Sequence, residues 1–404
     1  MRSRRAALIG SRTSGGGSAS GKRTIRRKIL PGRRTLSLSP DRSVSYFASA
    51  AALALAGLLP SCAPPSAYAG GFRPRQGPAP APSASELARR DLDRQLAETF
   101  APAIFHATRA SERPVSWDTP ARVDFDGDLI AANNEENLRA GLYPITPAVY
   151  YAVLETETHI FLVYGLFHPL DWSTVPAVFP YTWHENDMEN IQIVVEKANT
   201  TTNNSVVLLA AQAHLGTSLY AAPGISSGAI AISDRPLRVL NGAHAAVFVE
   251  SGGHGIYSIS DAPEELLTKT SDPPALREGI VFYPASNGPE PRGAIPYELL
   301  SIYDTFWAPY LDGSALGDGK LMDGSFSYYE RGMAWDHIPR HFDSDRLSGP
   351  CKTDSGILPF AFGFALTDPD LGSLFFNPAE KYAENLSISR PWSTKYLRHP
   401  YRAR

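Results

Sequence analysis

The chain has 404 residues, with 38 lysines and arginines against 41 aspartates and glutamates, a formal net charge of −3, and two cysteines. This small net charge hides a division, because residues 1–45 contain twelve basic residues and one acid, Asp41, whereas the chain from Cys62 onward contains 26 basic and 40 acidic residues. Such an acidic body argues against nucleic acid as a partner, since phosphate binding needs a basic face. Two cysteines exclude a disulfide framework and a cysteine-rich zinc site.

The first 69 residues indicate a targeting sequence. The basic segment is followed at 46–59 by an uncharged apolar stretch of about 14 residues, which is short for a membrane span and typical of a signal peptide. Two exits compete. The residues ending in Cys62 resemble a lipobox that would anchor the protein by lipid, and the A-x-A site ending at Ala69 would release it as a secreted or periplasmic protein. A downstream start, a bipartite organelle-targeting sequence and a basic tail that binds polyanions remain alternatives.

A Pro-rich linker is expected at 70–85, and the folded domain is expected over 86–404. Ser85 is a suitable N-cap for a first helix. The helical spacing of five apolar residues supports that helix: Leu87, Leu92, Leu96, Phe100 and Ile104.

After this helix the pattern changes to short β-branched and aromatic runs separated by glycine, proline, asparagine and aspartate turns. Strands are predicted at 150–155, 159–167, 189–197, 205–211, 243–250, 279–283 and 299–307. The first two flank a three-residue turn and predict a hairpin. The fold class expected is mainly β, an antiparallel β-sandwich with an N-terminal helix, long loops and C-terminal elaborations.

The most informative segment is a strand with acids at its beginning. Ile191, Ile193 and Val195 alternate with polar residues, so the odd positions are expected to face the core. Asp187 and Glu189 share that parity, which places two carboxylates on the core side at one end of the sheet. Uncompensated charge is costly there, and a divalent cation would satisfy it. The alternative is that both acids are ordinary surface residues at the start of a strand.

Two more strand ends carry polar side chains toward the same rim. Asp171 ends the strand before this segment, and His254 lies in a glycine-rich turn after the strand at 243–250. Asp171 could instead cap a turn, and His254 could be an ordinary turn histidine. Together with His184, these residues offer five candidate ligands to one rim of a sandwich.

At this segment the sequence resembles a known family. His184-Glu185-Asn186-Asp187-Met188-Glu189 is similar to the HEGDWE box of the vacuolar protein sorting-associated protein sixty-two family, with Asn186 in place of Gly and Met188 in place of Trp. The run from Phe248 to Tyr257 resembles that family's second signature, a strand that ends in Ser-His-Ala-x-Tyr.

A more distant resemblance is to the necrosis- and ethylene-inducing-like proteins, which carry a Pro-Lys-Asp element and a Gly-His-Arg-His-Asp-Trp-Glu heptapeptide on a β-sandwich. This resemblance implies a divalent cation held by Asp171, His184, Asp187 and Glu189. The neighbouring positions differ, because Trp183, Glu185, Asn186 and Met188 replace the family's residues. No implied ligand is lost, but the changes leave the partner and any toxicity open.

A second group of acids gives weaker evidence for a metal site. Asp124, Asp126 and Asp128 alternate, and Glu135 stands twelfth from Asp124, as in an EF-hand loop, but Leu129 occupies the position that requires glycine. Asx-turns between strands explain this loop more simply. Three aspartates among glycines in the last third of the chain are interpreted as surface-loop residues in the same way: Asp312, Asp318 and Asp323.

The leading hypothesis is an exported β-sandwich that binds one divalent cation and, through it, a polar ligand such as a sugar or lipid headgroup. One imidazole and three carboxylates favour Ca²⁺, Mg²⁺ or Mn²⁺ over zinc. The rival is a metal-dependent phosphodiester or ester hydrolase in which His254 or Glu185 moves protons. A third possibility is a structural protein whose ion ties strand ends together. The sequence does not indicate the oligomeric state.

Overall fold

The computed structural model describes residues 81–127, 133–173, 184–198, 203–214, 216–268, 275–285, 291, 293–308, 359–364 and 372–401. The helical elements are α2 (Ala84–Phe100), η2 (Val115–Asp118), α3 (Asn134–Ala140), η4 (Ile259–Asp261), η5 (Glu264–Leu266), η6 (Tyr303–Trp307), η8 (Pro359–Ala361), α6 (Ser373–Phe376) and α7 (Pro378–Asn385). The first strands are β1 (Ala103–Ala107), β2 (Ala148–Thr156), β3 (His159–Asp171), β4 (His184–Glu196), β5 (Ser205–Ala213), β6 (Gly216–Ala221) and β7 (Ile225–Ser227). The later strands are β8 (Val239–Leu240), β9 (His244–Val249), β10 (Ile256–Ser258), β11 (Gly279–Pro284), β12 (Ile295–Ser301), β13 (Leu386–Ile388) and β14 (Tyr396–Arg398).

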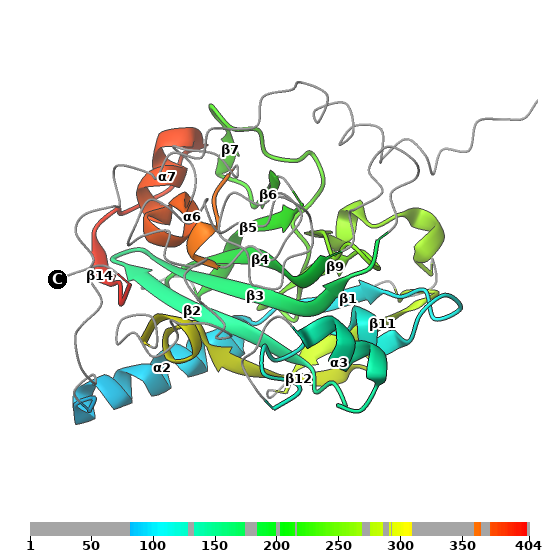
Figure 1. Ribbon diagram of the computed structural model, residues 1–404. Helices are drawn as coiled ribbons and strands as arrows, with labels where there is room; N and C mark the ends of the chain where they lie inside the picture. Colours follow the sequence, from blue (N-terminus) through cyan, green and yellow to red (C-terminus); the bar gives the residue numbers. More distant parts are fainter. Residues whose placement is uncertain are drawn as a thin grey trace, which may run out of the picture. The chain divides into compact units, whose positions relative to one another are not determined.

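Within these residues most strands belong to one sheet, with the order β10-β9-β1-β11-β12-β2-β3-β4-β5-β6 (Figure 1). The mainly β class is confirmed, and so is the predicted hairpin, since β2 and β3 pair antiparallel. The strictly antiparallel arrangement is not confirmed. β1 runs parallel to β9, and β12 runs parallel to both of its neighbours, so the sheet is mixed.

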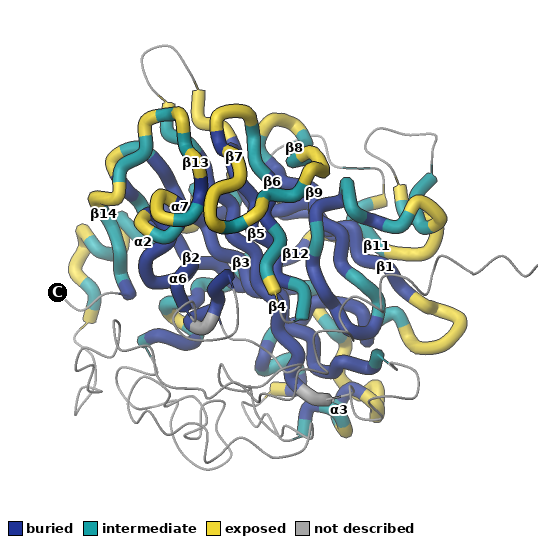
Figure 2. The backbone as a smooth tube through the Cα atoms, turned by 90° about the horizontal axis from the view of Figure 1, so that it is seen from above, coloured by how far each residue is buried: buried dark blue, intermediate teal, exposed yellow. Residues whose placement is uncertain are grey.

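The sheet buries an apolar layer between its two halves. Ile104 of β1 and Val247 of β9 share one hydrophobic cluster with Leu162, Ile193 and Leu209 from β3, β4 and β5. β10 also contacts β4 and β5. Figure 2 shows buried residues along β1, β2, β3 and β4, whereas exposed residues lie in connecting segments and in outer elements such as β7. The candidate site lies at one end of this apolar layer, where polar side chains of the same strands replace the apolar ones.

The other face of β2–β5 packs against the C-terminal helices, so β3 is buried along its whole length. Phe161 and Val194 point to this second layer together with Leu374 of α6 and Tyr382 of α7. The buried amide of Gln192 bridges the layers, because its Nε2 donates to the Leu374 carbonyl at 2.8 Å and its Oε1 accepts from the Tyr382 hydroxyl at 2.8 Å. A buried amide satisfied in this way avoids the 1–3 kcal/mol or so that an unpaired one costs.

Three predicted boundaries are wrong in detail. The first helix is capped by Ser83, whose hydroxyl accepts from the Glu86 amide, and not by Ser85. That helix ends at Phe100, and Ile104 belongs to β1. The strand expected at 299–307 ends at Ser301 and turns into a π-helical segment. Helical spacing failed at Ile104 because residues of a buried strand are also apolar, and periodicity alone does not separate the two states there.

His159, at the start of β3, leads to a pH prediction. Its ring is fully buried 4.2 Å from the Trp392 ring, and burial lowers its pKa from 6.5 to about 4. The unfolded chain therefore binds a proton that the folded chain excludes, and the free energy of unfolding should fall as the pH drops from 6.5 toward 4, by up to about 1.4 kcal/mol per pH unit. Urea unfolding across this range should show a shallower slope for His159→Phe than for the wild type. Identical slopes would show that His159 does not titrate as described.

Candidate functional site

The predicted carboxylates are all buried, near the adjoining ends of β3 and β4. Asp187 and Glu189 share the face of Ile191 and Ile193, as the alternation predicted. The antiparallel register places Asp187 opposite His168 and His184 opposite Asp171. Asp171, Asp187 and Glu189 are 2%, 4% and 3% exposed, so all three acids are buried. They are therefore not the surface acids that the alternative interpretation required.

Electrostatic repulsion accompanies this burial. Desolvation and then the charge of Asp187 raise the pKa of Asp171 well above its usual value. One compensating contact is a hydrogen bond at 2.7 Å from the Ser173 amide to the Asp171 carboxylate. Two buried acids close enough to perturb each other form a site that a cation would stabilise.

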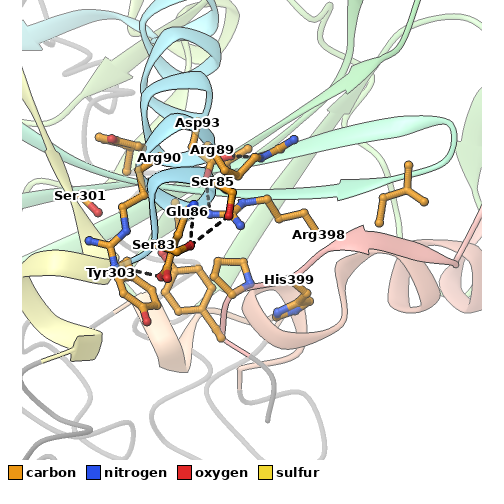
Figure 3. A pocket seen from close by; sticks show the side chains of 16 residues that line it. Ser83, Ser85, Glu86, Arg89, Arg90, Asp93, Ser301, Tyr303, Arg398 and His399 are labelled. Carbon is orange, nitrogen blue, oxygen red and sulfur yellow. Dashed lines mark hydrogen bonds and ion pairs between the residues drawn. The ribbon is translucent and has the colours of Figure 1, made fainter. Parts of the chain in front are cut away.

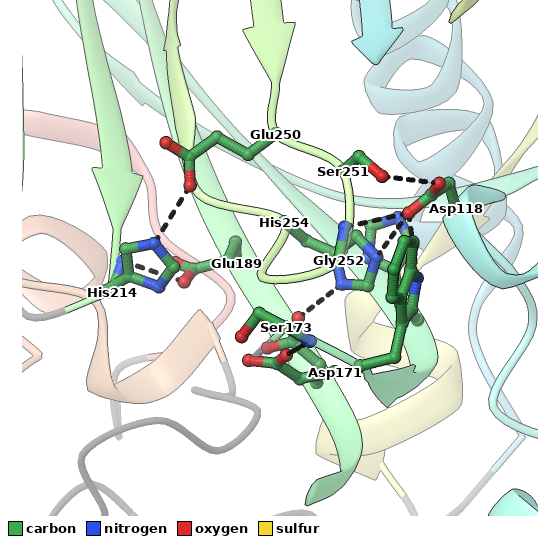
Figure 4. A network of polar contacts seen from close by, with 12 residues as sticks. Asp118, Asp171, Ser173, Glu189, His214, Glu250, Ser251, Gly252 and His254 are labelled. Atoms are coloured by element: carbon green, nitrogen blue, oxygen red, sulfur yellow. Dashed lines mark hydrogen bonds and ion pairs between the residues drawn. The ribbon is translucent and has the colours of Figure 1, made fainter. Parts of the chain in front are cut away.

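His254 lies between two carboxylates (Figure 4). Its Nδ1 is 2.6 Å from Asp187 Oδ2, and its Nε2 is 3.4 Å from Asp118 Oδ1. Burial alone would lower its pKa, but the interactions with Asp118 and Asp187 outweigh burial and raise the pKa to about 9. Since the side chain is completely buried, His254 organises the carboxylates and does not face solvent.

Asp118 is a central residue that the sequence did not indicate. It ends η2 and is 1% exposed. It accepts hydrogen bonds from Trp172 Nε1 at 3.1 Å, from the Gly252 amide at 2.9 Å and from the Ser251 hydroxyl at 2.9 Å. Burial raises its pKa, but the hydrogen bond with His254 and the other contacts lower it below its usual value. Asp118 thus joins the turn after β9 to the end of β3.

The glycine-rich turn after β9 brings a more exposed pair to the rim. His214 Nε2 is 3.1 Å from Glu250 Oε2, and both side chains are about a third exposed, 32% and 34%. The His214 amide donates to Glu189 Oε1 at 2.9 Å (Figure 4). A Cβ on Gly253 would lie 2.9 Å from the His214 ring, so the turn approaches this closely because it lacks a side chain there. The rim therefore presents polar side chains above the buried acids.

A second feature, also absent from the sequence interpretation, is a cluster of three buried imidazoles. His106 of β1, His168 of β3 and His254 offer nitrogen atoms that lie within 4.8 Å of one another, so they could hold a metal ion. Burial lowers the pKa of His106 to about 4 and that of His168 well below 6.5, so both rings are neutral. His106 and His168 lie in apolar strands and His254 in the turn after β9, far apart in sequence, so no local spacing signals their meeting.

Several sequence-based candidates lie outside the described structure. The backbone of His184 and Glu185 belongs to β4, but their side chains are outside the described part. Also outside are Cys62, Ala69, Asp128, Asp312, Asp318 and Asp323.

The acids of the EF-hand-like loop that the structure describes interact with other side chains of the protein. Both Asp124 oxygens accept from Arg122, Asp126 accepts from Asn137, and Glu135 pairs with Arg139. These contacts agree with the simpler explanation of a turn.

A cavity of about 700 Å³ opens elsewhere, between the start of α2, β2 and the segment around β14 (Figure 3). None of the site residues lines it. Arg89 pairs there with Asp93 and Glu155, and Arg398 also pairs with Asp93. The charges of these cavity residues are thus already compensated within the protein.

No family model and no curated protein matches the sequence, so the resemblance to the HEGDWE-box family has no independent support. The structural neighbours are necrosis- and ethylene-inducing-like proteins. One is NLPPya in complex with glucosamine, at 18% identity over 46% of this chain and 73% of that chain, with a TM-score of 0.25. A second is described as a toxin fold for microbial attack and plant defence, at 15% identity over 63% and 93%, with a TM-score of 0.27.

A third is the necrosis and ethylene inducing protein 2 from the causal agent of cocoa's witches' broom disease, at 14% identity over 58% of this chain and 81% of that chain, with a TM-score of 0.23. Similarity at this level assigns no function to the present chain.

Asp118→Asn should destabilise the protein for two reasons. The new amide N–H₂ group is a donor and would face the buried donors that Asp118 now accepts from, and His254 would lose one of its two charged partners. We expect a loss of about 2–4 kcal/mol in the free energy of unfolding, measured by chemical denaturation. Asp234→Asn, at an exposed aspartate, is the matched control and should change little. Equal effects of the two substitutions would contradict the organising role of Asp118.

Proposed function

We propose that this protein binds one divalent cation through Asp171, Asp187, Glu189 and His184. The observation that carries the proposal is the burial of three carboxylates at the end of an apolar layer. Oxygen-rich donor sets suit Ca²⁺, Mg²⁺ or Mn²⁺. The cation would neutralise the carboxylates, and the β4 register that sets His184 opposite Asp171 supports the inclusion of its imidazole.

The cation is proposed to hold a polar ligand, such as a sugar or a lipid headgroup. His214 and Glu250 support this, because they are partly exposed beside Glu189 and can exchange hydrogen bonds with hydroxyl or amino groups. The acidic surplus beyond residue 62 favours a neutral or cationic ligand over an anionic one.

Binding is favoured over hydrolysis by the burial of His254. This candidate proton donor is fully enclosed, and both its ring nitrogens face carboxylates, so it does not reach a bound substrate. The other candidate, Glu185, has its side chain outside the described residues. A metal-dependent hydrolase is therefore the second hypothesis, and a screen of phosphodiesters and esters tests it.

Export is part of the proposal and rests on the sequence of the first 69 residues, with a lipid anchor at Cys62 or cleavage after Ala69 as its two forms. Among the described helices, none is both long and apolar enough to span a bilayer.

Metal binding is tested by titrating chelator-treated protein with Ca²⁺ and Mn²⁺ in a calorimeter. Asp171→Asn and Glu189→Gln each remove a charged ligand and should weaken binding by more than about tenfold, with a smaller rise in melting temperature on adding Ca²⁺. Asp234→Asn should bind like the wild type. If both site variants retain wild-type affinity, the assignment of these ligands is wrong.

The ligand is tested on a glycan array and with neutral and zwitterionic vesicles, each in the presence of Ca²⁺ and of chelator. Binding abolished by chelator and by Asp171→Asn, without turnover of ester or phosphodiester substrates, is the expected result. Binding that persists in chelator would contradict a metal-held ligand, and chelator-sensitive turnover would favour the hydrolase.

A further inference from the structure

The buried imidazoles form a ligand set distinct from the carboxylates proposed above. His106, His168 and His254 come from β1, β3 and the turn after β9, and each is completely buried. One nitrogen atom of each ring lies within 4.8 Å of those of the other two. Two ligands held about 2.1 Å from a tetrahedral ion lie about 3.4 Å apart. The nitrogen pair His106 Nε2 and His168 Nε2, 3.1 Å apart, is near this spacing.

In His106 and His254, a hydrogen bond made by Nδ1 determines that Nε2 is the nitrogen available to bind a metal. His106 Nδ1 is 2.8 Å from the Ala107 carbonyl, which requires the proton on Nδ1 and leaves a lone pair on Nε2. His254 Nδ1 is 2.6 Å from Asp187 Oδ2, which leaves Nε2, 3.4 Å from Asp118 Oδ1, as the nitrogen available to a metal. A carbonyl or carboxylate behind the ring is the arrangement that metal-binding histidines use to hold tautomer and orientation.

The polar atoms of the cluster are incompletely satisfied by the protein itself. Among the described residues, His168 Nδ1 is buried without a hydrogen-bond partner, and His254 Nε2 has only a long contact of 3.4 Å with Asp118 Oδ1. His106 Nε2 and His168 Nε2 lie 3.1 Å apart, so without an ion one of these neutral rings must donate to the other. Buried polar groups are nearly always satisfied, so an imidazole nitrogen without a partner in this cluster needs an explanation.

A fourth donor and the charge balance come from two aspartates. Asp118 Oδ1 lies 3.4 Å from His254 Nε2, and its carboxylate is fixed by Trp172, Ser251 and Gly252. Asp187 stands behind His254. These two carboxylates, of which Asp187 also serves the first site, lower the cost of a divalent ion in a buried space.

We propose that His106, His168, His254 and Asp118 bind a second, structural metal ion of the zinc type, separate from the Ca²⁺-type site. Three imidazoles and one carboxylate favour Zn²⁺ and Co²⁺ over Ca²⁺ or Mg²⁺. The rings of His168 and His254 are stacked at 10° with their centroids 3.7 Å apart, so the proposal requires one ring to rotate before both can bind the same ion. Because every ligand is buried, the ion ties β1, β3, η2 and the turn after β9 together.

The test uses full-length protein stripped with chelator and titrated with Co²⁺. The wild type should take up one Co²⁺ with the visible absorption of a tetrahedral site, and one equivalent of Zn²⁺ should displace it. His106→Gln and His168→Gln should each weaken Co²⁺ binding more than about tenfold. Asp171→Asn and Glu189→Gln, which disturb the other site, should leave this absorption intact. Thus Ca²⁺ binding can fail while Co²⁺ binding succeeds, or the reverse.

Where a histidine variant does not fold, X-ray absorption of the Zn²⁺-loaded wild type decides, since it should show three imidazoles and one oxygen around the ion. An oxygen-only shell, no uptake of Co²⁺ by the wild type, or absorption that survives both histidine substitutions would overturn the proposal.

Discussion

The burial of ionisable side chains at the end of an apolar layer is the constraint on which the site depends. Strands β3 and β4 place aliphatic side chains between the two halves of the sheet, and the same alternation then delivers Asp187 and Glu189. Charges in such a position must be paired. The surrounding structure supplies one partner, His254, whose pKa rises to about 9 because Asp118 and Asp187 outweigh its burial.

The loops around the site make contacts that satisfy these buried charges. Asp118 is held by three donors from two loops, and the turn after β9 carries glycines where it passes His214. Gly252 itself has a φ of 90°, in the region that favours glycine, while its amide donates to Asp118. The loops are arranged around the buried charges, and the sheet beneath provides the rigid support that a binding site requires.

The sequence was sufficient for the parts of the fold that local periodicity encodes. The alternation around Ile191 and Ile193 located β4 and put Asp187 and Glu189 on its inner face, and the hairpin of β2 and β3 followed from two apolar runs around a short turn. It was insufficient for the parallel pairing of β1 with β9, because crossovers leave no local signal. That pairing brings His106 to His254, and a loop contact spanning more than 130 residues brings Asp118 to Ser251. Helix α7 begins with Pro378 in its first turn, a start signal that the sequence contains although no helix is predicted there.

The central claim is that a divalent cation compensates the buried acids, and crystals grown with Mn²⁺ test it most directly. The account predicts an anomalous peak about 2.0–2.6 Å from carboxylate oxygens of Asp171, Asp187 and Glu189, the range of hard-cation bonds. A map without a peak there, at a Mn²⁺ concentration that saturates the protein in solution, would contradict the account and leave the carboxylates to be satisfied by the protein alone.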